Sequence, residues 1–532
     1  MADPDDNADA VVIGAGPNGL VAANLLADAG WDVLVLEAQD EPGGAVRSAQ
    51  LTAPGFHSDL ASAFYPLAVA SPVLRDLDLE RYGLRWRHAP DALAHVLPDD
   101  RCAVISQDVG ATAGSLAAFA PGDGDAWRTE FDRWTRIRDR LLDAILTPFP
   151  PIRAGAGLLR ALGVGDALRF ARLAAMTSRA LGEERFAGEG GRVLLVGNAL
   201  HTDLGPAQAG GALFGWLLCM LAQDVGFPVP EGGAGALTAA LVGRLTDTGG
   251  RVRCGRSVTR VLTADGTAVG VLTADGGLIR ARRAVLATVP APELYLRLLD
   301  PDRLPAELVA DARRFRWDDA TVKVDWALSG PIPWRNPAAG RAGTVHLDGD
   351  VAGLAAYGGE LAGTGLPAHP FLVLGQMTTS DDTRSPAGTE SAWAYAHAPR
   401  DLPWTDDLTA RYADVLQAVI ERHAPGFGDR VLARYVQGPA DLQRRDANLV
   451  TGAINAGTAA LQQQLFLRPV PGLGRADTPV DRLFLAGASA HPGGGVHGAP
   501  GANAARAALA RAGAGGAAYR ALIRGAHRRI YR

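Results

Sequence analysis

The sequence predicts an α/β protein with two lobes, one of which is assembled from separate stretches of the chain. Residues 10–36 have the pattern of a strand, a glycine turn, a helix and a second strand, and residues 483–512 repeat the first three elements near the other end. Between them, residues 126–185 are mostly helical in pattern and residues 321–328 alternate like a half-buried strand. These observations favour a parallel βαβ lobe beside an α+β lobe with an antiparallel sheet and helices.

The first βαβ unit is Rossmann-like. An apolar strand at 10–13, a helix at 20–29 that ends at Gly30, and an apolar strand at 31–36 follow one another directly. Because a single helix joins the two strands, the strands must be parallel.

A region of short strands begins after Gly232. A helix is predicted at 236–247, and strands follow at 251–262, 268–273 and 278–288 with glycine-bearing turns between them. The end of the chain then returns to the opening pattern, with a strand at 483–486.

The glycine turn of the first unit has the spacing that a dinucleotide needs. Its glycines let the backbone approach a pyrophosphate, and the next helix presents unpaired N–H groups and the positive end of its dipole. Glu37, at the end of the second strand, is placed to bind the hydroxyl pair of a ribose. A glycine turn that binds nothing is disfavoured, because strand, helix and acidic residue are all in place. The predicted contacts are Gly14, Gly16, Pro17, Asn18, Gly19, Glu37 and Ala38.

Two further glycine segments favour a flavin dinucleotide over NAD. Gly43 and Gly44 let the backbone run beside a bulky planar ligand and Arg47 supplies a cation, although an ordinary surface turn is the alternative for this segment alone. Residues 483–501 form a strand, a glycine loop and the start of a helix. The N-terminus of that helix can face an isoalloxazine ring and stabilise the anion formed on its reduction.

Composition argues against several other classes of protein. The 532 residues are 48% hydrophobic and carry a net charge of −5 without a basic arm, which disfavours nucleic-acid binding. Cys102, Cys219 and Cys254 lie far apart, so we expect no disulfide framework, thiol redox centre or metal site. Residues 1–9 lack the features of a signal peptide and 193–221 is interrupted by polar residues. We expect a soluble, cytoplasmic protein with at most peripheral membrane contact.

These motifs together resemble the phytoene-desaturase-like FAD oxidoreductases, within the wider flavin amine oxidase superfamily. The resemblance extends nearly end to end and is most specific at 12–19 (VIGAGPNG) and 491–496 (HPGGGV). It is closest to the subgroup whose animal mitochondrial members are named after pyridine nucleotide–disulfide oxidoreductases. The sequence has neither a redox cysteine pair nor a second nucleotide glycine motif, so neither disulfide reduction nor NAD(P)H binding is supported.

The resemblance implies a bound FAD and a discontinuous FAD domain. The first glycines would meet the pyrophosphate, Glu37 the adenosine ribose, Arg47 the pyrophosphate or flavin, and Val258 the adenine. The ribityl chain and isoalloxazine would lie along Gly487, Gly495 and Val496. The implied division gives 8–75, 229–295 and 475–515 to the FAD domain, 76–228 to a mostly helical substrate or lid segment, 296–474 to a substrate domain with an antiparallel sheet, and 516–532 to a C-terminal tail.

Lys323 is the sharpest catalytic candidate. It is the only lysine among 52 Lys and Arg residues, and the resemblance implies that a lysine in such a strand holds a water at flavin N5. The alternative is that Lys323 and Asp325 share a solvent-facing side of their strand.

The histidines and one helical segment supply further candidates. His491 and His497 flank the flavin loop and are candidates for orienting the substrate. His201 could act with Asp203 as an acid–base pair, although a structural histidine is the commoner case. Residues 152–179 mix leucine and arginine, and could either dock on a membrane or cover the core as a lid.

The expected activity is removal of a hydride from a C–H bond beside an alkene or activating group, which leaves a C=C bond. The substrate would be small and hydrophobic, and oxygen or a quinone would accept the electrons. The alternatives are oxidation of a C–N bond, redox-neutral isomerisation by reduced flavin, and a non-catalytic role for a bound FAD. A homo-oligomer is possible.

Overall fold

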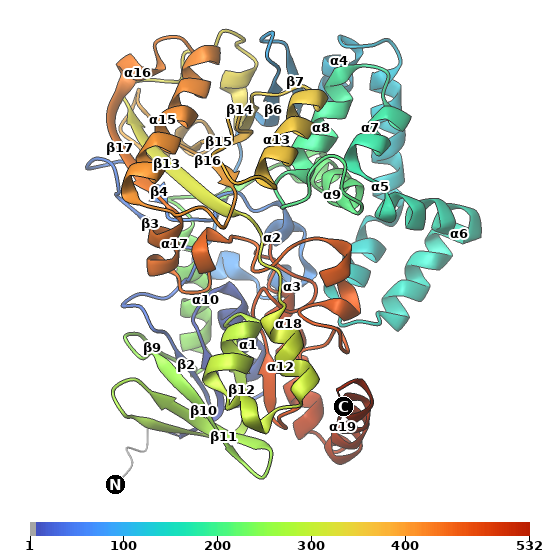
Figure 1. Ribbon diagram of the computed structural model, residues 1–532, viewed down its shortest axis with the longest axis vertical. Helices are drawn as coiled ribbons and strands as arrows, with labels where there is room; N and C mark the ends of the chain where they lie inside the picture. Colours follow the sequence, from blue (N-terminus) through green and yellow to red (C-terminus); the bar gives the residue numbers. More distant parts are fainter. Residues whose placement is uncertain (1–6, 532) are drawn as a thin grey trace.

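Two seven-stranded sheets organise the computed structural model, which describes residues 7–531. The first sheet lies in the lower lobe of Figure 1 and the second in the upper lobe. The expectation for residues 1–9 falls partly outside this range, because residues 1–6 are not among the described residues. None of the helices within residues 7–531 is both long and apolar enough to span a lipid bilayer.

The lower sheet brings together strands from three distant stretches of the chain. Its order is β10-β11-β12-β1-β2-β9, and β18 pairs with β12 off this path. All neighbours are parallel except β10 with β11 and β11 with β12. The strands are β1 (Asn7–Ile13), β2 (Val33–Leu36), β9 (Arg251–Arg253), β10 (Val258–Ala264), β11 (Thr267–Thr273), β12 (Leu278–Ala287) and β18 (Leu483–Leu485).

Three helices pack on this sheet. They are α1 (Pro17–Asp28), α10 (Gly235–Asp247) and α18 (Ala499–Ala512), and α1 lies between the other two. Leu20 and Leu26 of α1 are fully buried together with Leu241 of α10 and Ala504 of α18. The small residues of α1 and α18 let their backbones approach closely, which fixes where both helices begin.

The upper sheet has one apolar face and one mixed face. Its order is β17-β13-β16-β15-β14-β6-β7. Val322, Val324 and Trp326 pack toward α15. On the other face, Leu93, Val373 and Trp393 belong to a core cluster with residues of α8 and α9. The elements are β6 (Asp91–Val96), β7 (Cys102–Ile105), β13 (Ala320–Leu328), β14 (Ala342–Leu347), β15 (Leu372–Gln376), β16 (Glu390–Ala398), β17 (Val431–Gln437), α8 (Glu189–Ala199), α9 (Gly211–Asp224) and α15 (Asp406–His423).

Helices of the middle of the chain cover the right-hand side of the molecule in Figure 1. The longest are α5 (Asp123–Leu146) and α6 (Ile152–Ala175), and α6 is broken at Gly163, where φ is +69°. The remaining elements are β3 (Ser48–Ala49), β4 (Ser58–Asp59), β5 (Trp86–Arg87), β8 (Val229–Pro230), α2 (Pro66–Ala70), α3 (Pro72–Arg75), α4 (Val109–Ala117), α7 (Ser178–Arg185), α11 (Ala291–Glu293), α12 (Ala306–Arg313), α13 (Val351–Leu361), α14 (Met377–Ser380), α16 (Phe427–Arg430), α17 (Pro439–Arg445) and α19 (Gly516–Ile530).

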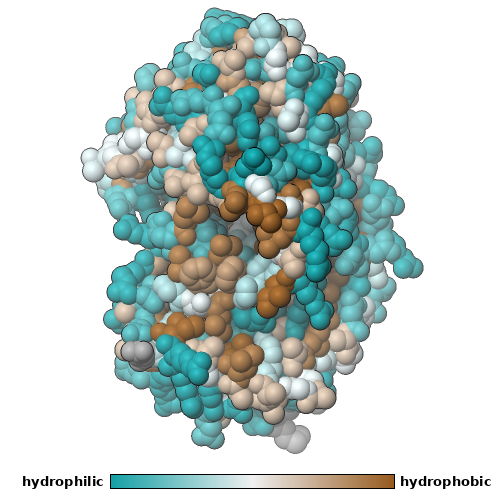
Figure 2. Space-filling model, turned by 90° about the vertical axis from the view of Figure 1, so that its right-hand side faces the viewer, coloured by the Kyte–Doolittle hydropathy of each residue, from teal (hydrophilic) through white to brown (hydrophobic). Residues whose placement is uncertain are grey.

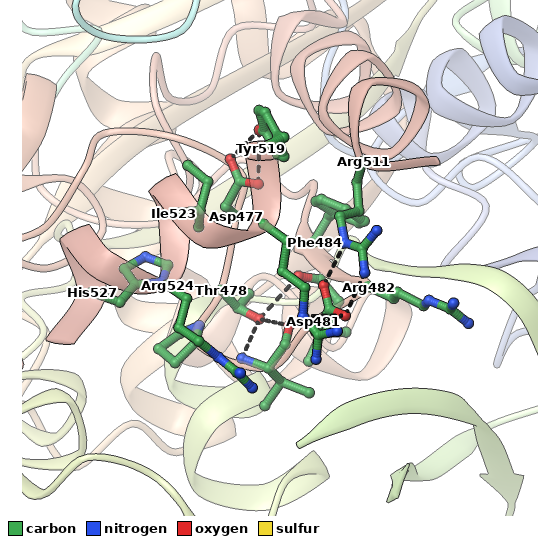
Figure 3. Close-up of a pocket in the computed structure, with 14 residues that line it drawn as sticks. Asp477, Thr478, Asp481, Arg482, Phe484, Arg511, Tyr519, Ile523, Arg524 and His527 are labelled. Atoms are coloured by element: carbon green, nitrogen blue, oxygen red, sulfur yellow. Dashed lines mark hydrogen bonds and ion pairs between the residues drawn. The ribbon is translucent and has the colours of Figure 1, made fainter. Parts of the chain in front are cut away.

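The C-terminal stretch is a docked helix, where the sequence predicts a tail. Tyr519 of α19 donates to Asp477 at 2.8 Å, and Arg511 and Arg520 both pair with Asp481. Figure 3 shows Tyr519, Asp477, Arg511 and Asp481 around a pocket of about 30 Å³, which Arg520 also lines. The ion pairs tie the end of the chain to the segment that leads into β18.

Three other details differ from the sequence-based expectation. The strand predicted at 251–262 is two strands, since β9 pairs with β2 and a turn at 254–257 leads to β10. The stretch 76–228 also supplies β6 and β7 to the upper sheet. Because β6 runs parallel to β14, that sheet is not purely antiparallel.

Candidate functional site

The ends of three parallel strands meet at one edge of the lower sheet. Ile13 lies in register with Ala287, and Ala287 with Leu485. The glycines that follow crowd around Thr288, since a Cβ on Gly14 would lie 2.3 Å from the Thr288 hydroxyl and one on Gly487 2.4 Å from its carbonyl oxygen. The two glycine segments from opposite ends of the sequence therefore converge.

The first turns of α1 and α18 touch each other at this edge. A Cβ on Gly501 would lie 1.9 Å from the carbonyl oxygen of Asn18, and one on Gly19 would lie 2.1 Å from that of Gly14. The N-cap of α1 is Gly16, followed by Pro17, with no side-chain cap and no acidic residue in the first turn. Free N–H groups and the helix dipole are thus directed at whatever anion lies before α1.

Glu37 lies at the same edge of the lower sheet, directly after β2. Its carboxylate accepts the N–H of Ala15 at 2.7 Å and that of Gln39 at 3.0 Å. Its carbonyl accepts the N–H of Arg256, two residues before Val258 at the start of β10. A carboxylate has further lone pairs, so Glu37 can still accept hydrogen bonds from ribose hydroxyls. Ala38 beside it is exposed.

The segment that holds Gly43 and Gly44 lies directly against the first glycine turn. Gly43 donates to the carbonyl of Ala15 at 2.9 Å, and a Cβ on Gly44 would lie 3.2 Å from the Cα of Gly16. Both glycines have positive φ, 124° and 55°, which favours glycine. Arg47 donates to the carbonyls of Gly44 and Arg445.

A basic cavity of about 320 Å³ borders these residues. It is lined by Gln39, Arg47, Tyr435, Asp441, Arg444 and Arg445. Glycines whose Cβ atoms would fill the cradle, a free helix N-terminus and adjacent arginines fit a pyrophosphate-bearing dinucleotide.

The glycine loop between β18 and α18, residues 486–498, is here called the flavin loop. Its conformation is fixed by contacts with neighbouring residues. Gly495 has φ +120°, and a Cβ on it would lie 2.8 Å from Leu67; Val496 has φ +53°. His497 accepts the N–H of Ala499 through Nδ1, which caps the start of α18.

His491 donates through Nε2 to the carbonyl of Thr147. Burial lowers the pKa of His491 and of His497 to about 4, so both are neutral near pH 7. The structure thus gives both candidate histidines backbone partners, and their contact with a substrate stays a prediction.

Lys323 does not face solvent. It is 3% exposed and forms an ion pair with Asp325, which is also buried. Gln437 donates to Asp325 and to the carbonyl of Leu60, whose N–H binds the carbonyl of Arg47. The solvent-face alternative is therefore wrong, and the buried pair is joined through Gln437 to the segment that carries Arg47.

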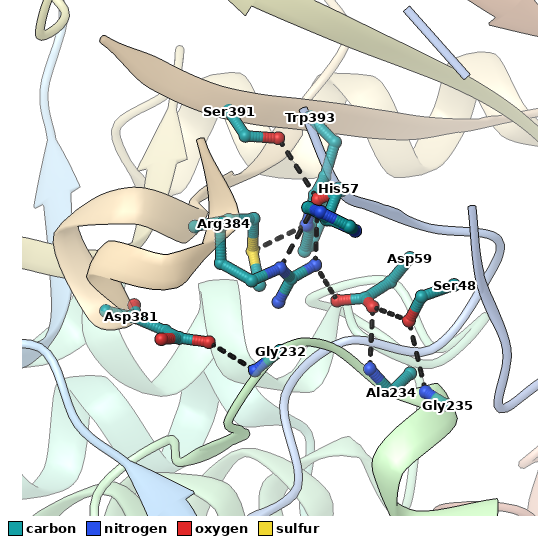
Figure 4. A network of polar contacts seen from close by, with 12 residues as sticks. Ser48, His57, Asp59, Gly232, Ala234, Gly235, Asp381, Arg384, Ser391 and Trp393 are labelled. Carbon is teal, nitrogen blue, oxygen red and sulfur yellow. Dashed lines mark hydrogen bonds and ion pairs between the residues drawn. The ribbon is translucent and has the colours of Figure 1, made fainter. Parts of the chain in front are cut away.

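A second buried ion pair lies between β4 and the segment that follows α14. Asp59 and Arg384, both fully buried, pair at 2.8 Å. Asp59 also accepts from the hydroxyl of Ser48 at 2.7 Å and from the N–H of Ala234 at 2.8 Å. Figure 4 shows the guanidinium of Arg384 directed at Asp59, with Ser48 and Ala234 on the other side of that carboxylate. Sequence reasoning missed this pair, because its partners are far apart in the chain and no local pattern marks either of them.

Arg468 is another buried cation that the sequence did not reveal. It donates to four carbonyl oxygens, those of Asn455, Ala456, Thr458 and Ala488. A Cβ on Gly493 would lie 3.4 Å from its guanidinium. Arg468 thus holds residues 455–458 against the flavin loop, and no local pattern in the sequence marks it for this role.

Histidines and aromatic rings gather on the mixed face of the upper sheet. His201 and His346 approach at 2.8 Å between their Nε2 atoms, and His95 packs edge-on to His346. Asp203, the partner suggested for His201, instead accepts the N–H of Ala459. The predicted pair is therefore not formed, and the imidazoles associate with one another.

A chain of ring contacts runs from His201 along this face of the sheet. From His201 the rings follow one another at 5.4–6.4 Å between centroids, through Phe227, Phe64, Trp393 and Tyr395 to His397. On the other side, Asn455 donates to the carbonyl of His201, and a Cβ on Gly494 would lie 3.3 Å from the Asn455 carbonyl oxygen. Asn455 therefore links His201, the first member of this chain of rings, to the flavin loop.

Large apolar side chains are exposed on α6 and on a nearby loop. In α6 these are Ile152, Leu159, Val164 and Leu168, between 60% and 81% exposed. Leu465 and Phe466 are about half exposed, and Phe466 stacks near Phe149 at 5.5 Å. Figure 2 shows the side of the molecule on which α6 lies, with a hollow rimmed by hydrophobic residues.

Comparison with known proteins agrees with this geometry. The chain is 29% identical over 546 residues to the mouse pyridine nucleotide-disulfide oxidoreductase domain-containing protein 2, covering 93% of this chain and 92% of the mouse protein. It is 27% identical over 552 residues to a neurosporene-forming phytoene desaturase of Cereibacter sphaeroides, covering 95% of each.

The fold is shared with a solved structure. An oxidoreductase from Methanosarcina mazei superposes with a TM-score of 0.62 at 16% identity, covering 94% of this chain and 99% of that one. The predicted fold class is thereby confirmed.

A family model gives the assignment. The model described as flavin containing amine oxidoreductase matches residues 18–509, from the first turn of α1 to the end of α18. This match confirms the expected class, an oxidoreductase with FAD as its cofactor, and the resemblance seen in the sequence. The chain belongs to the flavin containing amine oxidoreductase family.

Proposed function

We propose that this protein desaturates a hydrophobic substrate, removing two hydrogens from adjacent carbons to leave a C=C bond. The observation that carries the proposal is the composition of the chain of rings that begins at His201, which Asn455 links to the flavin loop. This chain consists of aromatic rings and imidazoles, and burial lowers the pKa of His201 and His397 to about 4. The ammonium of Lys323 over the Trp393 ring is paired with Asp325. Such a surface suits an apolar substrate better than a cationic one.

FAD supplies the oxidant when it is bound, by accepting a hydride at the flavin. The residues of the chain have the tasks of positioning and of excluding water. Phe64, Phe227 and Trp393 offer apolar surface to the substrate, while the glycine segments at the sheet edge hold the dinucleotide. Holding the donor carbon in contact with the flavin in a dry space reduces the entropic part of the barrier.

Oxidation of an amine is the competing function. Lys323, which would serve such an oxidase at the flavin, is neutralised by Asp325 in a buried pair. One of the similar proteins is a phytoene desaturase, and this similarity favours oxidation of a carbon–carbon bond over oxidation of a C–N bond.

Anaerobic reduction of the bound flavin tests the proposal. Purified holoprotein is mixed under argon with isoprenoid polyenes, with terpenes and with a panel of primary and secondary amines, and the flavin absorbance is followed. We expect bleaching by a member of the first two classes and none by amines. Bleaching by amines alone would replace the proposal with C–N oxidation. Product formation without net bleaching would indicate isomerisation.

We propose also that α6 delivers the substrate from a lipid surface. Leu159 and Leu168 are exposed beside Arg153, Arg160 and Arg169, and this mixture suits an anionic bilayer. Flotation with phosphatidylglycerol vesicles should carry the wild type and fail for Leu159→Glu combined with Leu168→Glu. Leu432→Glu on β17, 59% exposed, is the matched control. Equal flotation of both variants would contradict the proposal.

Two further expectations from the sequence stay predictions. They are oxygen or a quinone as the electron acceptor, and a homo-oligomer.

A further inference from the structure

The row of three histidines on the mixed face of the upper sheet has a single consistent direction of hydrogen bonding. His95 lies in β6 and His346 in the adjacent strand β14, in register with each other. His201 follows α8 and is the only one of the three that is not fully buried. Gly197 of α8 makes room for the row, since a Cβ there would lie 2.7 Å from Nδ1 of His346 and 3.1 Å from Nδ1 of His95.

The inner end of the row fixes the tautomer of His95. Its Nε2 lies 2.9 Å from the carbonyl oxygen of Gly349. A carbonyl only accepts, so Nε2 of His95 must carry the proton and Nδ1 must carry a lone pair. Among the described residues, neither Nδ1 of His95 nor Nδ1 of His346 has a hydrogen-bond partner within bonding distance. Both atoms lie close to Gly197, each within 3.1 Å of the position that a Cβ on that residue would take.

The tautomer of His346 follows from that of His95. If Nδ1 of His346 also carried a lone pair, two buried lone pairs would lie close to Gly197 without a proton between them. The arrangement with lower electrostatic energy places the proton of His346 on Nδ1, next to the lone pair of His95. Nε2 of His346 then accepts, so Nε2 of His201 donates across their 2.8 Å contact.

The remaining ring nitrogen of His201 is therefore a free acceptor. With Nε2–H committed to His346, Nδ1 of His201 keeps its lone pair. His201 is in ring contact with Phe227, and its carbonyl accepts from Asn455 beside Gly494 of the flavin loop. Within residues 7–531 no group of three His, Cys, Asp or Glu side chains is arranged to hold a metal ion, so the row is not a metal centre.

We infer that His201 is the proton acceptor of the desaturation, with His346 and His95 as positioning residues that set its tautomer. The inference rests on the proposed function and names the group that completes it. One C–H bond of the substrate breaks with its electron pair, which leaves with the hydrogen as a hydride to FAD. On the adjacent carbon the hydrogen passes as a proton to Nδ1 of His201, and the electron pair left behind forms the C=C bond. The substrate loses two electrons, and FAD is the oxidant.

A neutral, weakly basic imidazole is adequate for this step. Burial lowers the pKa of His201 to about 4, with His397 nearby adding to the effect. A carbon atom next to a developing carbocation is a strong acid, so the proton moves downhill even to a weak base. A base of low pKa also stays unprotonated near neutral pH and remains available before each turnover.

The decisive variant is His201→Gln, whose side-chain amide reaches the position of Nε2 but offers no basic nitrogen at Nδ1. Under argon, with an alkene that bleaches the wild type, we expect the bleaching rate to fall about 10²–10⁴-fold. The dissociation constants of substrate and FAD should not change. His423→Asn controls for the loss of a buried imidazole, because His423 lies on the other side of the sheet, bonded to Asp100.

Nitrogen-15 NMR of histidine-labelled holoprotein gives a readout that does not depend on turnover. The eleven histidines can be assigned by single substitutions. His201 should show a protonated Nε2 and a bare Nδ1 in the wild type, and both tautomers in His346→Phe. A proton on Nδ1 of His201 in the wild type would overturn the inference.

The kinetic outcomes separate the inference from the proposed function. If the wild type is bleached by an alkene and His201→Gln is bleached at the same rate, the inference is overturned and the desaturase assignment stands. If no alkene or polyene bleaches the wild type, the proposed function fails and the inference fails with it. A slow variant with unchanged binding and the expected tautomer supports both.

Discussion

Gly501 and Asn18 are in backbone contact, although nearly the whole chain separates them. A Cβ on Gly501 would lie 1.9 Å from the Asn18 carbonyl oxygen. This contact sets the first turn of α18 against the first turn of α1, and so places the flavin loop beside the first glycine turn. The dinucleotide cradle depends on it.

Gly501→Ala should therefore weaken FAD binding. The added methyl cannot be accommodated without separating two backbones, and overpacking of this kind costs about 1–3 kcal/mol. We expect at least a tenfold higher dissociation constant for FAD, measured by fluorescence titration of the apoprotein, and a lower thermal midpoint. Gly525→Ala in α19 is the matched control, because a Cβ there meets no atom within 4 Å. Unaltered FAD affinity in Gly501→Ala would contradict the contact.

Asp59→Asn should be strongly destabilising. It leaves the guanidinium of Arg384 buried without its counter-ion, a change that costs about 3–5 kcal/mol in comparable buried pairs. The thermal midpoint should fall clearly. Asp99→Asn removes a pair whose partners are both more than half exposed, and should have almost no effect. Similar midpoints for the two variants would show that the buried pair adds nothing to the stability of the fold.

Lys323→Met should destabilise the protein because Asp325 loses its buried partner. Combining it with Asp325→Asn removes the unpaired charge, so we expect the double variant to recover most of the loss in thermal midpoint. The stable double variant then isolates chemistry from folding. If Lys323 acts at the flavin, reoxidation of the reduced flavin by oxygen should be slower in the double variant. An unchanged rate would assign Lys323 a structural role alone.

Asp319→Asn should stabilise the protein more as the pH rises. Burial, with Asp203 and Asp318 nearby, raises the pKa of Asp319 from 3.8 to about 7. The folded state therefore keeps a proton that the unfolded chain releases, and stability is lost as the pH rises between these two values. The gain in thermal midpoint over the wild type should be larger at about pH 8 than at about pH 5. Asp407→Asn, on an exposed carboxylate, should give no such trend.

The parts of the fold that could be predicted are those with a local signature. Gly14, Gly16 and Gly19 identify a phosphate-binding turn because strand, turn and helix are contiguous, and β1, α1 and β2 lie close to the predicted ranges. That the regions of α1 and α18 belong to one lobe could be predicted, because both ends of the chain carry the same pattern of strand, glycine turn and helix.

The missed features depend on pairing between distant segments. β6 joins β14 across some 250 residues, and an apolar run such as that of β6 does not reveal its partner. His95 and His346 each read as an isolated histidine in an apolar strand, where a satisfied core side chain is the default. Only the register of the two strands shows that they face each other.

The position of β12 between β1 and β18 has a consequence for synthesis on the ribosome. The strand that completes the sheet edge, and the helix that packs against α1, are translated after every other strand of this sheet. A nascent chain synthesised as far as the end of β12 forms only part of the cradle. The surface of α1 that α18 covers in the folded protein is then still exposed. The complete cradle therefore cannot form until residues 483–512 have been synthesised.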